Sequence, residues 1–390
     1  MAALMAALAQ AQGPAAAPAT APPGIVLLQD SAYQVRFRFR MQDRATFLGG
    51  YNHGMAANSY DMQVRRFRLK LEGFAVSPRL EYKVQIGLAD HDMAIGDGTA
   101  AASPLLDAMV FYKAAARTRI GFGQGKLPGG RQAMISSGEL QLPERPIANQ
   151  AFTLDRDKGI FLVQDLPLAG RPVRVQAAVS NGQGRAAYAS NKGLCYTGRL
   201  EWFPFGEFHG NGAYVEGDQY REPAPKLAVA AAYSTDRNAL RQRAQQGPLF
   251  PLGQDRTINT FFADAMFKYK GFAWENDFAS RLAGGSPFVQ DTTAHGMAAV
   301  NEGWGFTSQA SRMLGTKAEL IARYSVVRPD ANVRAQYHDE DEAVLGFTYY
   351  LNGHRVKLQS ALLYHWRDGI ADMDHAGNHY GAMLQVELGI

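Results

Sequence analysis

The stretch that decides the fold is residues 34–40, which read QVRFRFR and alternate apolar residues with arginines. Successive side chains of a β-strand point to opposite faces, so this stretch has one apolar face and one basic face. The same alternation returns at residues 66–72, which read RFRLKLE. Strands of this kind need water on one face and an apolar environment on the other.

The alternation recurs along most of the chain. Further stretches with a period of two begin near Arg79, Val173, Phe261, Ala318, Val356 and Tyr380. A soluble sheet can contain one such strand, but many of them with charged wet faces are typical of a transmembrane β-barrel. Lipid then lies outside the barrel and water inside. We expect an outward orientation for Phe37, Leu69, Val84, Leu358 and Leu384.

Composition agrees with an all-β membrane protein. The chain is 46% hydrophobic and 19% charged, which is below the roughly 25% charge of ordinary soluble domains. We find no stretch near the ~18 consecutive apolar residues that indicate a membrane helix. The length after the N-terminal tail allows about 16 strands with their connections. We therefore predict a closed antiparallel transmembrane β-barrel of about 16 strands. The net charge of +4 is modest, and we expect no nucleic-acid partner.

The chain divides into a tail, residues 1–24, and a barrel, residues 25–390. The tail begins with small apolar residues, and Ala9-Gln10-Ala11 fits the small-x-small pattern of a signal cleavage site. It lacks the basic start of a signal peptide, so we interpret it as a partial signal segment and an Ala/Pro-rich tether. An Ala-rich disordered tail is the alternative. The single cysteine, Cys195, excludes an internal disulfide framework.

Several motifs in order along the chain resemble those of one known family. They are RRFRL at 65–69, GQGKLPGGR at 123–131, PER at 143–145 and RDKG at 156–159. Together they resemble the phosphate-selective porin O and P family. The resemblance implies an outer-membrane β-barrel of a Gram-negative bacterium, usually with 16 strands and often a homotrimer, that passes phosphate-like anions. The C-terminal Ile390 departs from the phenylalanine usual there.

The predicted wet faces carry chemistry suited to anions. Arginine donates two parallel hydrogen bonds from a planar fork and stays charged. Arginines two apart on a strand share a face at a spacing of ~6.6–7 Å, which gives an anion successive weak sites. Residues 33–90 contain ten Lys or Arg but five Asp or Glu. The candidate pore-lining and anion-binding residues are Arg36, Arg38, Arg40, Arg65, Arg66, Arg68, Lys70, Lys83, Arg131 and Arg145. Alternatively, these residues only keep the lumen wet and pair with acids.

Two of these candidates, Arg65 and Arg66, are adjacent. Neighbouring residues of a regular strand point to opposite faces, so both point inward only if a β-bulge intervenes.

The segment 129–158 lacks clean alternation and is long. Irregular backbone at membrane depth is tolerated only where it lines a cavity or is buried in protein. We predict that this segment folds into the barrel as a constriction loop and brings Arg131, Glu139, Glu144 and Arg145 near the path. An ordinary surface loop is the alternative.

Acidic residues on later strands keep other functions open. The acids that we place on lumen faces are Asp264, Glu275, Asp277, Glu319 and Glu342. A general or cation-preferring porin is therefore the first alternative. A barrel enzyme such as an outer-membrane lipase is the second; it needs a serine and a histidine on the outer face, and His365 falls on the lumen face.

Several short motifs suggest a phosphate-binding loop or a metal site but lack the required residue spacing. The glycines of 121–126 lack the phosphate-loop spacing. Asp90, His91 and Asp92 with Asp97 lack the calcium-loop spacing, and His375 and His379 lie in a stretch that reads as a loop. We expect no cofactor, no metal and no catalytic constellation.

Overall fold

The computed structural model describes residues 24–52, 55–93, 103–185, 193–251, 253–291, 296–368 and 377–390. The predicted signal segment and tether lie almost entirely outside the described residues, and so do Asp97 and His375. Among the described residues, no helix is both long and apolar enough to cross a membrane.

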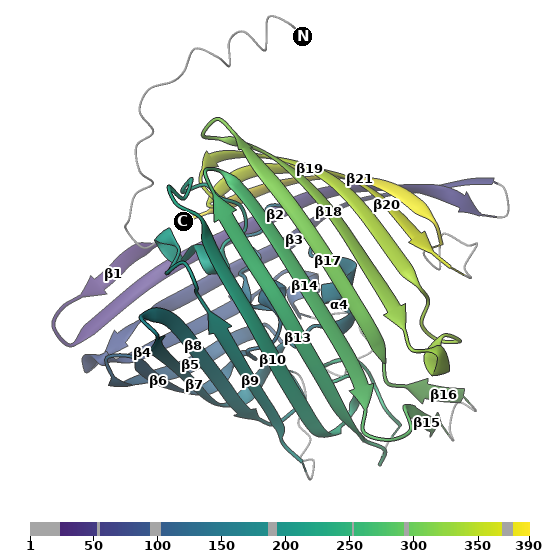
Figure 1. Cartoon of the computed structure of the whole chain (residues 1–390), viewed down its shortest axis with the longest axis horizontal. Helices are drawn as coiled ribbons and strands as arrows, with labels where there is room; N and C mark the ends of the chain where they lie inside the picture. The colour runs from purple at the N-terminus through teal and green to yellow at the C-terminus, as the bar shows by residue number, and fades with distance from the viewer. Residues whose placement is uncertain are drawn as a thin grey trace, which may run out of the picture.

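Sixteen antiparallel strands form a closed barrel (Figure 1). They are β2 (Tyr33–Asn52), β3 (Met55–Ala75), β4 (Ser77–Gly87), β5 (Leu105–Ala115), β6 (Thr118–Lys126), β7 (Arg156–Leu168), β8 (Arg171–Ser180), β9 (Cys195–Trp202), β10 (Lys226–Ala239), β13 (Arg256–Tyr269), β14 (Phe272–Ala283), β17 (Gly303–Leu314), β18 (Ala318–Pro329), β19 (Glu340–Asn352), β20 (Val356–Arg367) and β21 (His379–Gly389). The last strand returns to the first, from the pair Arg40↔Gly389 to the pair Gly50↔His379. The predicted closed barrel of 16 strands is confirmed.

The remaining described elements are short. β1 (Ile25–Gln29) pairs with the start of β2. Two small hairpins join β11 (Arg241–Arg243) to β12 (Gln246–Leu249) and β15 (Phe288–Asp291) to β16 (Gly296–Ala299). The helices are α2 (Asp90–Met93), α3 (Arg131–Met134) and α4 (Ile147–Phe152), with 3-10 turns η1 (His209–Tyr214) and η2 (Ala331–Val333).

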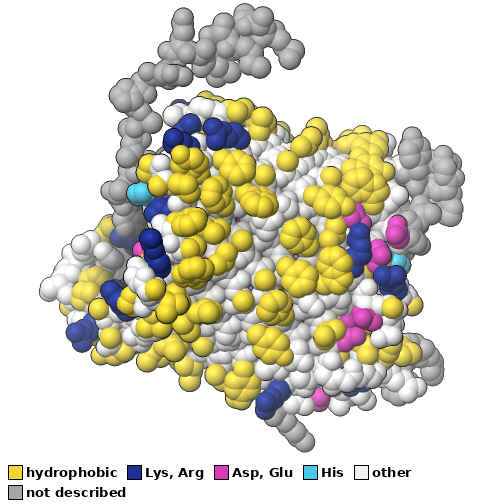
Figure 2. Space-filling view, in the orientation of Figure 1, with side chains coloured by type: hydrophobic (Ala, Val, Ile, Leu, Met, Phe, Trp, Pro, Cys, Tyr) yellow, Lys and Arg dark blue, Asp and Glu magenta, His cyan; other side chains and the backbone are white. Residues whose placement is uncertain are grey.

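The strands place apolar side chains outside and polar side chains inside. In β17, Trp304 is 43% exposed while Thr307 and Gln309 are buried. Val84, Leu358 and Leu384 are exposed, as predicted, and the predicted outward residues Phe37 and Leu69 are partly exposed. Hydrophobic side chains cover the middle of the face shown in Figure 2, and charged side chains gather toward the strand ends. Soluble proteins place apolar side chains inside and polar ones outside; the opposite arrangement seen here suits a barrel surrounded by lipid.

The two ends of the barrel differ. At one end, which we call the turn end, six of the seven connections between strands have one to three residues. The seventh, residues 203–225 between β9 and β10, is long and folds back into the barrel. We call it the turn-end insert. Nothing in the alternation pattern predicted this insert. At the opposite end, the loop end, every connection except the one between β2 and β3 has ten or more residues.

The predicted constriction loop enters the lumen as residues 127–155, between β6 and β7, and we call it the inner loop. Its tip reaches the far wall, where Lys357 Nζ donates to the carbonyls of Gly138 and Leu140 at 2.8 and 2.7 Å. Gln359 Nε2 donates to Leu140 O and Gln141 O at 3.1 and 2.8 Å. The inner loop therefore crosses the lumen, which confirms the predicted inward fold.

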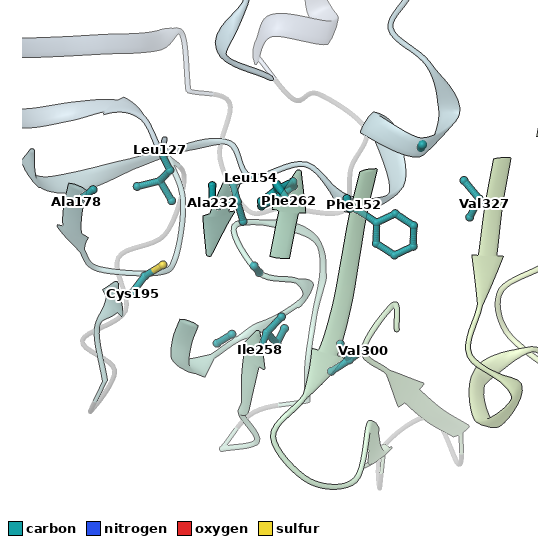
Figure 3. Packing of buried hydrophobic residues seen from close by; sticks show 14 of the residues in the cluster. Leu127, Phe152, Leu154, Ala178, Cys195, Ala232, Ile258, Phe262, Val300 and Val327 are labelled. Carbon is teal, nitrogen blue, oxygen red and sulfur yellow. The ribbon is translucent and has the colours of Figure 1, made fainter. Parts of the chain in front are cut away.

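One side of the lumen is filled by apolar packing (Figure 3). Leu127, Phe152 and Leu154 of the inner loop are buried against Ile258 and Phe262 of β13. Our expectation that the whole lumen face would be wet does not hold here, because the inner loop supplies an apolar partner for inward positions such as Phe262. Charged side chains such as Arg40, Arg68 and Lys83 line another part of the lumen, on β2 to β4.

Candidate functional site: a basic cavity and constriction

A β-bulge places two adjacent arginines inside the barrel. The pairing of β2 with β3 slips between Gln42↔Arg66 and Asp43↔Val64, so that Arg65 is the extra residue. The side chains of Arg65 and Arg66 are both buried, at 6% and 3% exposure. This bulge allows both side chains to point inward, as the sequence required.

Arg65 and Arg66 line a cavity of about 600 Å³ inside the barrel. The other candidate residues in its lining are Arg68 and Arg145. Five further cations line it: Lys126, Arg156, Arg185, Arg241 and Arg243. The carboxylates in the lining are Asp92, Glu144 and Asp155. Nine cationic side chains thus face three carboxylates. We call this space the basic cavity.

None of these five further cations was among the pore-lining residues predicted from the sequence. Lys126 and Arg156 are the last residue of β6 and the first of β7, so they flank the inner loop. That position is the one signal that could have marked them. Arg185, Arg241 and Arg243 come from connections at the loop end, where strand alternation carries no information.

One carboxylate anchors the inner loop to the barrel wall. Glu144 Oε1 accepts from Arg65 Nε at 2.5 Å and also from Arg44, and Glu144 Oε2 lies 3.9 Å from Arg66 Nη2. Burial disfavours the charged carboxyl, but the three arginines outweigh it and hold the pKa of Glu144 below its usual range. Glu144 is therefore ionised at neutral pH.

Two cations of the cavity hold backbone carbonyls of the inner loop. Arg145 Nε donates to Gln132 O at 2.8 Å and its Nη2 to Ile135 O at 2.7 Å. Lys126 Nζ donates to Ile135 O at 3.0 Å. In the described part of the chain neither is paired with a carboxylate within 4.0 Å. Burial, and then the charge of Arg68, lower the pKa of Arg145 to about 10, so it stays protonated at neutral pH.

The basic face of β2 and β3 contacts the inner loop at two serines. Arg40 donates to Ser136 Oγ at 3.2 Å and to Ser137 Oγ at 2.7 Å. Arg68 donates to Ser137 Oγ at 3.0 Å and to Asp92 Oδ2 at 2.9 Å. Arg40 therefore contacts both serine hydroxyls and Arg68 contacts one of them, and we call this contact the constriction.

Between the constriction and the turn end, the inward face of β2, β3 and β4 carries further basic residues. The strand register sets Arg38 opposite Lys70, Arg40 opposite Arg68, and Glu72 between Arg36 and Lys83. Lys83 Nζ lies 2.8 Å from Asp107 Oδ2, and Glu72 pairs with Lys70 and Arg38. We call the seven residues Arg36, Arg38, Arg40, Arg66, Arg68, Lys70 and Lys83 the basic wall. They lie on three successive strands, as the alternation implied.

Arg131 is placed elsewhere. It is fully buried, and its Nη2 and Nε lie 2.6 Å from Glu201 and 2.9 Å from Asp264. It does not line the basic cavity. Two of the acids predicted on later lumen faces are also covered: Glu275 accepts from Gln132 of the inner loop at 3.0 Å, and Glu319 accepts from Tyr350 at 2.6 Å.

A second cavity of about 720 Å³ lies beside the basic cavity, sharing Gln150 and Arg243. Its lining balances three arginines with three carboxylates and includes His338, His365 and His379. His365 thus faces inward, as predicted. Among the described residues, no group of three His, Cys, Asp or Glu side chains has the geometry to hold a metal ion.

The Glu144 anchor predicts an acid-sensitive pore. A carboxyl whose pKa is lowered by folding stabilises the structure fully above its ordinary pKa, about 4.3, and loses this contribution as the pH falls below it. Single-channel recordings should therefore be unchanged from pH 8 to 5 and become noisy below about pH 4. Glu144→Gln should be noisy already at pH 7. A quiet Glu144→Gln channel would contradict the anchor.

Comparisons with known proteins agree with the barrel fold. Residues 34–217 match the model of the family phosphate-selective porin O and P. No curated protein sequence matches the chain.

Solved porin structures share the fold at low sequence identity. The outer membrane channel DcaP of Acinetobacter baumannii has 12% identity and a TM-score of 0.59, covering 95% of this chain and 100% of its own. OmpF of Salmonella typhi has 13% identity and a TM-score of 0.59, and the match covers 94% of this chain and 100% of OmpF. The anion-selective porin from Comamonas acidovorans has 11% identity and a TM-score of 0.56, and the match covers 92% of this chain and 100% of that porin.

The closed barrel with its inward-folded loop and apolar outer surface defines an outer-membrane porin. Residues 34–217, which include the basic wall and the inner loop, match the phosphate-selective porin O and P family. The resemblance predicted from the sequence is confirmed, and so is the outer-membrane location.

Proposed function

We propose that this porin passes small anions, phosphate or polyphosphate among them, by passive diffusion along the basic side of its lumen. The observation that carries the proposal is the lining of the basic cavity, where nine cations face three carboxylates. A pore selects by the charge, diameter and hydrogen bonding of its lining. Such a cavity concentrates anions and repels cations.

The path that we propose has three parts. An anion enters the basic cavity from the loop end, where neither Arg145 nor Lys126 has a described carboxylate within 4.0 Å. It then passes the constriction by replacing a serine hydroxyl on Arg40 or Arg68 with one of its own oxygens. It leaves past Arg38 toward the turn end. Arg131 is left out of this path because its charge is already paired.

Arginine at the constriction favours oxyanions over halides. Its planar fork can donate two hydrogen bonds to two oxygens of one phosphate, whereas a spherical chloride cannot use this geometry fully. We infer that phosphate-like solutes bind there long enough to slow chloride passage.

A channel, and not a barrel enzyme, is what these features support. The lipase alternative needs a histidine on the outer face, but His365 lines an inner cavity. The general or cation-preferring porin is the competing outcome of the test, because acids line other parts of the lumen. A homotrimer in outer-membrane lipid is part of the proposal; a structural relative, OmpT of Vibrio cholerae, is described in a trimer form.

The test is the reversal potential of the purified porin in a lipid bilayer across a KCl gradient. Anion preference gives a potential of the sign set by chloride. A potassium-signed potential would favour the alternative.

A further inference from the structure

One buried carboxylate of the turn-end insert, Glu216, accepts hydrogen bonds from two places in the inner loop. The insert also contacts the loop where Arg131 donates to Ala213 O and where Ile135 and Leu140 pack in an apolar cluster. Glu216 is 2% exposed. Its Oε1 accepts from Gln132 Nε2 at 2.8 Å, and its Oε2 accepts from the backbone N–H of Gln141 at 2.6 Å. Its own backbone N–H donates to Glu139 O at 3.0 Å. These bonds grip the inner loop on both sides of the constriction serines.

The insert is itself held firmly by the barrel. Lys268 Nζ donates to Val215 O at 2.7 Å, and Gln309 Nε2 donates to Glu216 Oε2 at 3.2 Å. Gly217 has a left-handed backbone with φ of 71°, and a Cβ there would lie 2.8 Å from Gln141 Nε2 and from both carboxylate oxygens of Glu319. A residue larger than glycine would push the insert away. The insert is therefore a fixed support beneath the inner loop.

We propose that Glu216 is a positioning residue of the pore, which sets the width of the constriction by fixing the inner loop relative to the basic wall. This inference rests on the proposed function, because it assumes that ions pass between that loop and that wall. Hydrogen bonds to a carboxylate are stronger than neutral ones and are strongest in water-excluded surroundings. No other described carboxylate accepts from residues on both sides of Ser136 and Ser137.

The inner loop keeps other attachments when this carboxylate is removed. Lys357 and Gln359 still hold its carbonyls at the far wall, so the loop should remain across the lumen. Gln132 and the Gln141 N–H, however, each lose an acceptor. The loop should then move between positions nearer to and farther from the basic wall, and the current should switch between levels.

The test compares Glu216→Ala and Glu216→Gln with the unmodified porin in single-channel recordings. Loss of charge-assisted hydrogen bonds should raise the fraction of time spent in altered conductance levels about tenfold or more for Glu216→Ala. Glu216→Gln keeps the size of the side chain and one acceptor oxygen, so it should fold and show a smaller increase.

Glu222→Gln is the matched control. Glu222 lies in the same insert and is 1% exposed, but it accepts from His209 N at 2.7 Å and from His209 Nδ1 at 2.6 Å, within the insert. Its substitution should leave the conductance levels unchanged. The proposal is overturned if both Glu216 variants record like the unmodified porin, or if Glu222→Gln switches equally. The reversal potential of the unmodified porin tests the anion path separately.

Discussion

Replacing Arg38, Arg66 and Arg68 together by glutamine should lower the anion-to-cation permeability ratio of the porin roughly tenfold. A unit charge about 8 Å from a permeating ion attracts an anion, and repels a cation, by about 0.5 kcal/mol in water-like surroundings. Screening at ~0.1 M salt about halves this energy, so three charges change the difference between the two ions by about 1.5 kcal/mol. The same change should weaken the block of chloride current by phosphate, because two of the three arginines lie at or beside the constriction. The measurement is the reversal potential at low salt, since exposed charges are screened beyond about 8 Å at physiological salt.

A matched triple variant controls for net charge. Arg117, Arg171 and Lys317 are exposed residues at turns of the turn end, and none lines the basic cavity. Their replacement by glutamine removes the same charge and should leave the reversal potential nearly unchanged. If the two triple variants behave alike, the basic wall is structural and the lumen does not select through it.

Replacing residues 136–142 of the inner loop by two glycines should raise single-channel conductance roughly twofold or more, because conductance follows the free cross-section of the narrowest point. These residues reach from Arg40 on one wall to Lys357 and Gln359 on the other. Their removal opens the lumen where it is now crossed. Selectivity should fall at the same time, because ions then pass farther from the basic wall.

A second variant separates the backbone of the loop from its side chains. Replacing the same seven residues by a Gly-Ser sequence of equal length keeps a chain across the lumen and should raise conductance less. Both variants need an intact barrel, shown by a heat-shifted band on a gel. Unchanged conductance in the shortened variant, with the barrel intact, would place the ion path elsewhere.

The barrel itself could be predicted from local sequence because strand alternation is a local property. Each residue of 34–40 takes its face from its neighbours, and lipid outside selects the apolar face wherever the strand lies. The constriction loop could be predicted for a similar reason: 129–158 breaks the alternation at membrane depth. The inward orientation of Arg65 beside Arg66 could be stated only as a condition, because a bulge depends on the pairing strand.

The interior of the lumen could not be predicted, because it depends on contacts between distant segments. Arg131 is neutralised by Asp264, 133 residues away, and by Glu201, 70 residues away. Its motif gives no sign of either partner. The Phe262 side chain points into the barrel but is buried from water, because the inner loop packs against it. The turn-end insert looks like an ordinary connection until Glu216 is seen to meet the inner loop.

The measurement that tests the central claim most directly is the reversal potential of the unmodified porin across a tenfold KCl gradient at neutral pH, starting from low salt. Nine cations against three carboxylates in the basic cavity predict a chloride-signed potential. They also predict that the potential shrinks as total salt rises, because screening weakens the field of the lining. A potassium-signed potential, or a potential near zero at low salt, would contradict the account.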